Sequence, residues 1–153
     1  MVASKSLVGR DESFRFYLMT STPQPIATFG LTHIALGVRD VERAFAFYER
    51  IFGMVMVYRG EGFLQAQTPG ARDVIVFETA TKSLGKSGGI AHFGFRLMDP
   101  AAIDAAAAAI VAAGGEIEEK GEFVPGEPYI FARDIDGYLF EVWFELPTTA
   151  DPN

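Results

Sequence analysis

The chain has 153 residues, no cysteine and a formal net charge of −7. This length is enough for one domain, or for two half-domains that share a core. The acidic balance argues against nucleic-acid binding, which needs a basic face, and no segment approaches the roughly 20 apolar residues of a membrane span. Without cysteine there are no disulfides or thiolate metal ligands, and without a signal-peptide pattern the cytoplasm is the expected compartment.

Both ends of the chain are predicted to lie outside the domain. Residues 1–29 are rich in Ser, Thr and Pro and form an N-terminal arm, which either stays disordered or adds an edge strand or a dimer contact. Residues 148–153 form a C-terminal tail. No chemistry is assigned to either segment.

The first unit, residues 30–80, begins with an alternating strand that ends at Val38. Asp40 is a good N-cap for a helix with an apolar stripe, and Gly53 ends that helix in a left-handed cap. Three strand-like runs follow: Met54–Tyr58, Gly62–Gln67 and Asp73–Thr79.

The second unit, residues 90–147, repeats this order after a polar, glycine-rich linker. Asp99 caps its helix, which is predicted over Ala101–Ala113. The predicted strands are Ile90–Leu97, Glu116–Lys120, Tyr129–Arg133 and Tyr138–Glu145. The sequence therefore predicts an α+β fold in which two βαβββ units form curved mixed sheets around a shared pocket.

The two histidines of the chain lie at equivalent points of this repeat. His33 and His92 are 59 residues apart, as are the two capping residues Asp40 and Asp99. Duplicated units usually pack against each other and can build one site between them. An imidazole from each half would suit a shared metal site.

We predict that His33, His92 and Glu141 hold a divalent ion of Fe, Mn, Ni, Co or Zn. Two imidazoles and a carboxylate leave coordination positions open for a substrate. The alternative is that the histidines are structural and Glu141 is an ordinary strand residue, but a carboxylate among large apolar neighbours needs a partner. A fourth ligand is either Glu78 or water, because the first-unit counterpart of Glu141 is Val76, which cannot bind a metal.

Three further residues are candidates for substrate binding, and no catalytic residue is identified. Arg96 shares a strand face with His92, so its guanidinium either holds a carboxylate or phosphate or forms an ion pair at the rim. Trp143 and Tyr129 are either pocket walls or packing residues.

The motifs of both units resemble the vicinal oxygen chelate superfamily, which includes glyoxalase I, bleomycin-resistance proteins, fosfomycin thiol transferases and extradiol dioxygenases. The segments that carry the resemblance are Leu31–Leu36, Phe47–Met54 and Asp134–Glu141. The resemblance implies the glyoxalase-like fold, and it implies that the first-strand His of each unit and Glu141 are metal ligands.

Several positions depart from particular branches of that superfamily. Val76 and Gly37 stand where glyoxalase I has a ligand and an arginine, and Phe131 and Ile135 stand where extradiol dioxygenases have Tyr and Pro. The function predicted is a metal-dependent enzyme acting on a small substrate with adjacent oxygens, by lyase or isomerase chemistry. The alternatives are an extradiol-type dioxygenase and a non-catalytic binding protein of the bleomycin-resistance kind. A homodimer is expected, with the two units paired within one chain or swapped between chains.

Overall fold

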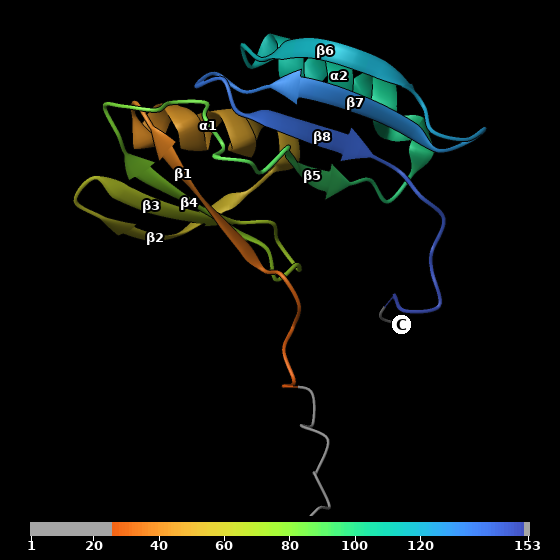
Figure 1. The fold of residues 1–153 in the computed structure, drawn as a ribbon, viewed down its shortest axis with the longest axis horizontal. Helices are drawn as coiled ribbons and strands as arrows, with labels where there is room; N and C mark the ends of the chain where they lie inside the picture. The colour runs from red at the N-terminus through yellow and green to blue at the C-terminus, as the bar shows by residue number, and fades with distance from the viewer. Residues whose placement is uncertain (1–25, 152–153) are drawn as a thin grey trace, which may run out of the picture.

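A computed structural model describes residues 26–151 of the protein as two four-stranded sheets, each covered on one face by helix (Figure 1). Within these residues no helix is both long and apolar enough to cross a membrane. The N-terminal arm predicted for residues 1–29 lies outside the described part except for its last four residues, where the Arg72 guanidinium lies 3.8 Å above the ring centroid of Phe29.

The first sheet has the strand order β1-β4-β3-β2, with β1 and β4 parallel and the other pairs antiparallel. Helix α1 packs against β3 and β4. The elements of this unit are β1 (His33–Val38), α1 (Val41–Phe52), β2 (Val55–Gly60), β3 (Phe63–Gln67) and β4 (Val74–Thr79).

The second sheet repeats the pattern as β5-β8-β7-β6, with β5 and β8 parallel. Helix α2 packs against β6, β7 and β8. The elements of the second unit are β5 (Phe93–Arg96), the 3₁₀ turn η2 (Pro100–Ala102), α2 (Ile103–Ala112), β6 (Glu116–Glu122), β7 (Pro128–Arg133) and β8 (Leu139–Trp143). The predicted α+β fold of two βαβββ units is confirmed, although the two sheets do not close into one barrel.

The strand registers show that the two units are structural equivalents. Ala35 in β1 pairs with Val76 in β4, and Gly94 in β5 pairs with Glu141 in β8. Ala35 and Gly94 are again 59 residues apart. Val76 therefore occupies in the first sheet the position that Glu141 occupies in the second.

In the second unit the starts of the first strand and of the helix differ from the prediction. The strand predicted from Ile90 begins only at Phe93, because β5 is an edge strand whose single partner, β8, begins to pair with it there. His92 therefore lies just ahead of the strand. The helix predicted from Ala101 opens with the 3₁₀ turn, since Pro100 and the Asp99 side chain organise only that first turn, where Asp99 accepts from the backbone N–H of Ala101.

Helix α1 joins the two units through one aromatic core. The Asp40 carboxylate accepts hydrogen bonds from the first-turn N–H groups, and Gly53 ends the helix at φ 63°. The ring of Tyr48 contacts Phe77 of the first sheet, and Phe52 stacks on Phe95 of the second sheet with centroids 3.8 Å apart. The apolar faces of both sheets are thus buried against the same helix.

A buried carboxylate reinforces this connection between the two units. Asp134, at the turn between β7 and β8, accepts a hydrogen bond from the Tyr48 hydroxyl at 2.7 Å. Its other oxygen accepts from the backbone N–H groups of Asp136 and Tyr138, and the Tyr138 hydroxyl donates to the carbonyl of Gly37 at 2.8 Å. The turn of the second unit is therefore bonded to both α1 and β1 of the first. Burial raises the pKa of Asp134, although the three hydrogen bonds oppose this.

Replacement of Asp134 by Asn tests this connection between the units through the pH dependence of the free energy of unfolding. Because the pKa of Asp134 is higher in the folded than in the unfolded state, its contribution to stability is present below about pH 4 and is lost as the pH rises through the folded-state pKa. The free energy of unfolding of the wild type minus that of Asp134→Asn should therefore fall between about pH 4 and pH 7. Urea unfolding at constant ionic strength measures it.

The control is Asp104→Asn, which removes the same charge at a position whose side chain is 84% exposed. A wild-type minus Asp134→Asn difference that stays flat or rises over this pH range would contradict the raised pKa of this buried carboxylate.

Candidate functional site

The clearest functional feature of the second sheet is the contact between His92 and Glu141. Nε2 of His92 lies 3.2 Å from Oε2 of Glu141. Parallel pairing of β5 with β8 places Gly94 beside Glu141, and His92 precedes Gly94 by two residues, so both side chains lie on one face. Glu141 is buried, whereas the His92 side chain is 36% exposed. The pair therefore combines a protected carboxylate with an accessible imidazole.

Burial raises the pKa of Glu141, and the neighbouring His92 opposes that effect through its charge and its hydrogen bond. A carboxylate that has lost its water shell needs a cation or a donor close by. In the described chain, His92 is the partner that meets this need. A divalent cation would meet it more fully.

Aromatic side chains surround this pair. The ring of Phe131, which pairs with Glu141 from β7, makes an edge contact with the His92 ring at a centroid distance of 5.0 Å. On β8, Trp143 lies two residues after Glu141, and its ring covers Gly94 so closely that a Cβ there would be 2.6 Å from the indole. We call the face that carries His92, Glu141 and Trp143 the site face.

The other histidine lies across a cavity from this face. His33 opens β1, the edge strand of the first sheet, and His92 precedes β5, the edge strand of the second. A cavity of about 470 Å³ lies between these two edges, and both imidazoles and Trp143 contribute to its lining. The two predicted histidine ligands thus share one cavity within a single chain.

The predicted set of three is nevertheless incomplete in one copy of the chain. Among residues 26–151 no three His, Asp or Glu side chains are grouped closely enough to hold a metal ion. Glu78 does not complete the set, because β4 pairs it with Gly37. That position is four residues from His33, about 13 Å along the strand.

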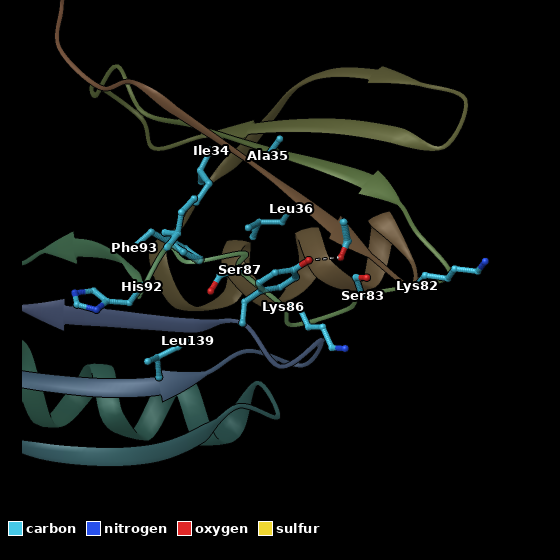
Figure 2. Close-up of a pocket in the computed structure, with 13 residues that line it drawn as sticks. Ile34, Ala35, Leu36, Lys82, Ser83, Lys86, Ser87, His92, Phe93 and Leu139 are labelled. Carbon is cyan, nitrogen blue, oxygen red and sulfur yellow. Dashed lines mark hydrogen bonds between the residues drawn. The ribbon is translucent and has the colours of Figure 1, made fainter.

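A second cavity, of about 330 Å³, adjoins the first along β1 (Figure 2). Its walls include Ile34, Phe93 and Leu139, with His92 at one end. The segment that connects the two units contributes four polar residues to it: Lys82, Ser83, Lys86 and Ser87. His92 therefore borders both cavities.

The predicted substrate-binding residues lie in one row of the site face. Trp143 pairs with Arg96 on one side and with Tyr129 on the other. Trp143 lines the larger cavity, whereas the Tyr129 ring stacks on Phe123 and its hydroxyl donates to Glu119. Arg96 is occupied by the segment after β8, since its guanidinium donates two hydrogen bonds of 3.0 Å to the carboxylate of Asp151.

Asp73 lines the larger cavity, as His33 does, and was not singled out by the sequence. Its carboxylate accepts hydrogen bonds from the backbone N–H and the hydroxyl of Thr68. Asp73 reaches this position because Val74 pairs with His33 in the parallel β1–β4 ladder. In the sequence it is only the first residue of a strand, and no spacing connects it with a histidine 40 residues away.

Comparison with known proteins identifies the fold and the family. The family model described as the Glyoxalase/Bleomycin resistance protein/Dioxygenase superfamily matches residues 30–142. The chain belongs to this superfamily, as the motif resemblance predicted.

A curated relative is the uncharacterized protein PA2024 of Pseudomonas aeruginosa. It is 34% identical over 125 residues, which are 76% of this chain and 89% of the relative.

Solved structures with the same fold include a fosfomycin resistance protein and a glyoxalase-related enzyme. The fosfomycin resistance protein FosX of Listeria monocytogenes, crystallised with Mn(II) and sulfate, is 24% identical with a TM-score of 0.65, covering 78% of this chain and 93% of that one. A glyoxalase-related enzyme from Fulvimarina pelagi is 22% identical with a TM-score of 0.65, covering 82% of this chain and 96% of that one. At these identities the likeness shows the fold.

The packing of Trp143 over Gly94 gives a direct test of the site face. In Gly94→Ala the added methyl group would overlap the indole, so the ring must shift from its present position. We expect a shift in tryptophan fluorescence, which reports Trp143 alone because the chain has one Trp, together with a loss of about 1–3 kcal/mol in stability.

The matched control is Gly60→Ala in β2, where a Cβ would press on the Phe63 ring at 3.0 Å and would come no closer than that to any other side chain. An unchanged emission spectrum for Gly94→Ala, or an equal shift for the control, would show that Trp143 is not held as described.

Proposed function

We propose that this protein is a divalent-metal-dependent enzyme that acts on a small substrate with two adjacent oxygens. The observation that carries the proposal is the 3.2 Å contact between His92 and the buried carboxylate of Glu141. One imidazole and one carboxylate on a rigid sheet are two of the three ligands that this chemistry uses. Membership of the superfamily and the Mn(II) held by the FosX structure support the same choice, and make Mn²⁺ the first ion to test.

We propose that His33 of a second copy of the chain completes the ligand set. One chain does not group three ligands among its described residues, and its own His33 shares only the cavity lining with His92. In a symmetric dimer, β1 of each copy would lie against the site face of the other. Each of the two sites would then receive the missing imidazole from the opposite copy. The edge strand β2 also leaves Val55, Met56, Val57 and Tyr58 about half exposed, which is apolar surface that such a dimer could bury.

The reaction class proposed is a lyase or isomerase reaction at a carbon next to the chelated oxygens. The bound ion would act as a Lewis acid that stabilises negative charge on a substrate oxygen. His92 and Glu141 would hold it, with Phe131 packed against the His92 ring and Trp143 packed over Gly94 beside them. With both histidines of the sequence used as ligands, a carboxylate is the natural proton acceptor. Asp73 lines the same cavity as His33, so it would come to the shared site with His33 from the second copy.

Two alternative functions predict different metal and oxygen requirements. An extradiol-type dioxygenase would require iron and consume oxygen during turnover. A binding protein of the bleomycin-resistance kind would bind its ligand without metal, and His33→Ala would leave that binding unchanged.

Metal titration is the first test. Purified metal-free protein should bind about one Mn²⁺ per chain in isothermal calorimetry, and His92→Ala or Glu141→Gln should weaken binding by about 100-fold or more. The reason is that each substitution removes a ligand from the only pair that the described chain preassembles.

Glu78→Gln is the matched control, since Glu78 is an exposed carboxylate at the end of β4. Equal losses for Glu78→Gln and Glu141→Gln would point to a non-specific site, and no stoichiometric binding by the wild type would contradict the metal-dependent function.

Mixing two inactive variants tests whether the site is shared. His33→Ala lacks one ligand and Glu141→Gln lacks another. A heterodimer of the two would restore one of its two sites if His33 comes from the second copy. When equal amounts are refolded together, about a quarter of the wild-type Mn²⁺ sites should therefore reappear.

The control mixture is His92→Ala with Glu141→Gln, which should restore no site because both residues come from the same copy. If neither mixture restores binding while wild-type protein treated in the same way does, the ligands come from one chain and the shared site is wrong.

A further inference from the structure

The segment after β8 runs away from the sheet and then turns to bind Arg96 (Figure 1). The two guanidinium–carboxylate hydrogen bonds to Asp151 are each 3.0 Å long. The same guanidinium donates to the carbonyls of Glu145 and Leu146 at 3.2 and 3.3 Å. Asp151 is itself held in a turn by the N–H of Thr148, at 2.7 Å. A carboxylate is therefore presented to Arg96 by the chain's own C-terminal segment.

This two-bond geometry is the one by which arginine recognises a carboxylate, phosphate or phosphonate on a ligand. Arg96 also lies in a useful place. It is paired with Trp143, next to the row that holds Gly94 and Glu141, so an anion bound there would sit beside the proposed metal ligands. Arg96 thus lies on the site face, although its guanidinium is turned toward the segment after β8.

The contacts that hold the segment are weak enough to be exchanged. Residues 146–150 are exposed, and the Arg96 and Asp151 side chains are 30% and 29% accessible. Ion pairs of this exposure contribute little to stability, because water and salt compete for both partners. A substrate anion that also binds the metal would displace Asp151 readily.

We infer that Arg96 is an anion subsite of the proposed enzyme, and that Asp151 is its built-in occupant, which a substrate bearing a carboxylate, phosphate or phosphonate displaces. The inference rests on the proposed function for the identity of the ligand as a substrate. It narrows that substrate to a compound with an anionic group beside its adjacent oxygens. Asp151 then acts as an intramolecular competitor that sets the affinity for such compounds.

Fluorescence of Trp143, the sole tryptophan of the chain, provides the measurement. Metal-free full-length protein is titrated with inorganic phosphate at low ionic strength. Asp151→Asn should bind phosphate about 3- to 5-fold more tightly than the wild type, because a competitor worth no more than an exposed ion pair has been removed. Arg96→Gln should abolish the phosphate-dependent change, and in the Arg96→Gln background the Asp151 substitution should have no effect.

Two controls separate this role from a general change of charge or a structural role. Asp104→Asn removes one negative charge at a position paired with Lys120, and should leave phosphate affinity unchanged. Glu145→Gln, whose carboxylate lies 3.4 Å from Arg96 in the wild type, should give a smaller gain than Asp151→Asn because it makes a single contact.

The proposal is overturned if Asp151→Asn binds phosphate no more tightly than the wild type, or if it only lowers stability to urea. It is also overturned if the gain persists in Arg96→Gln. Because these titrations contain no metal, they can show the phosphate effect even if Mn²⁺ does not bind, and Mn²⁺ can bind even if they show no effect. A failure of this inference is therefore distinguishable from a failure of the proposed function.

Discussion

The arrangement of the two units depends on one buried carboxylate. The Asp134 carboxylate accepts a hydrogen bond from the Tyr48 hydroxyl of α1 in the first unit, and two more from backbone N–H groups of its own turn. A buried carboxylate without these donors would destabilise the fold, so the turn and the helix are held in one relative position. The turn leads directly into β8, the strand that carries Glu141 and Trp143. The position of the site face relative to β1 therefore follows from a contact made on the opposite side of the second sheet.

Duplication has produced two similar sheets with different chemistry. The registers make Val76 the counterpart of Glu141, so the first unit supplies an imidazole position but no buried carboxylate. A single chain therefore holds one preassembled pair of ligands rather than two. This asymmetry is the physical reason for proposing a site shared by unlike halves, with His33 from one side and the His92–Glu141 pair from the other.

The two interpretations of Arg96 that the sequence leaves open are both physically reasonable. The guanidinium forms an ion pair at the rim, and the partner is a carboxylate in the geometry that an anionic ligand would use. Since the partner belongs to an exposed segment, the ion pair and the anion subsite are two states of the same residue in our proposal. The family resemblance is silent on this point, because it covers the fold and the metal position.

The sequence alone determined the order of elements, the duplication and the equivalence of His33 with His92, because helix caps, strand alternation and a 59-residue repeat are local patterns. The alternation of its first strand also predicted one apolar face, as the burial of Leu36 and Val38 confirms. Only the tertiary structure decided that Glu141 contacts His92 while His33 lies across a cavity, that Asp73 lines that cavity, and that Asp151 binds Arg96. These contacts depend on parallel pairing between strands far apart in the chain and on the path of an exposed segment, and neither leaves a periodic signal in the sequence.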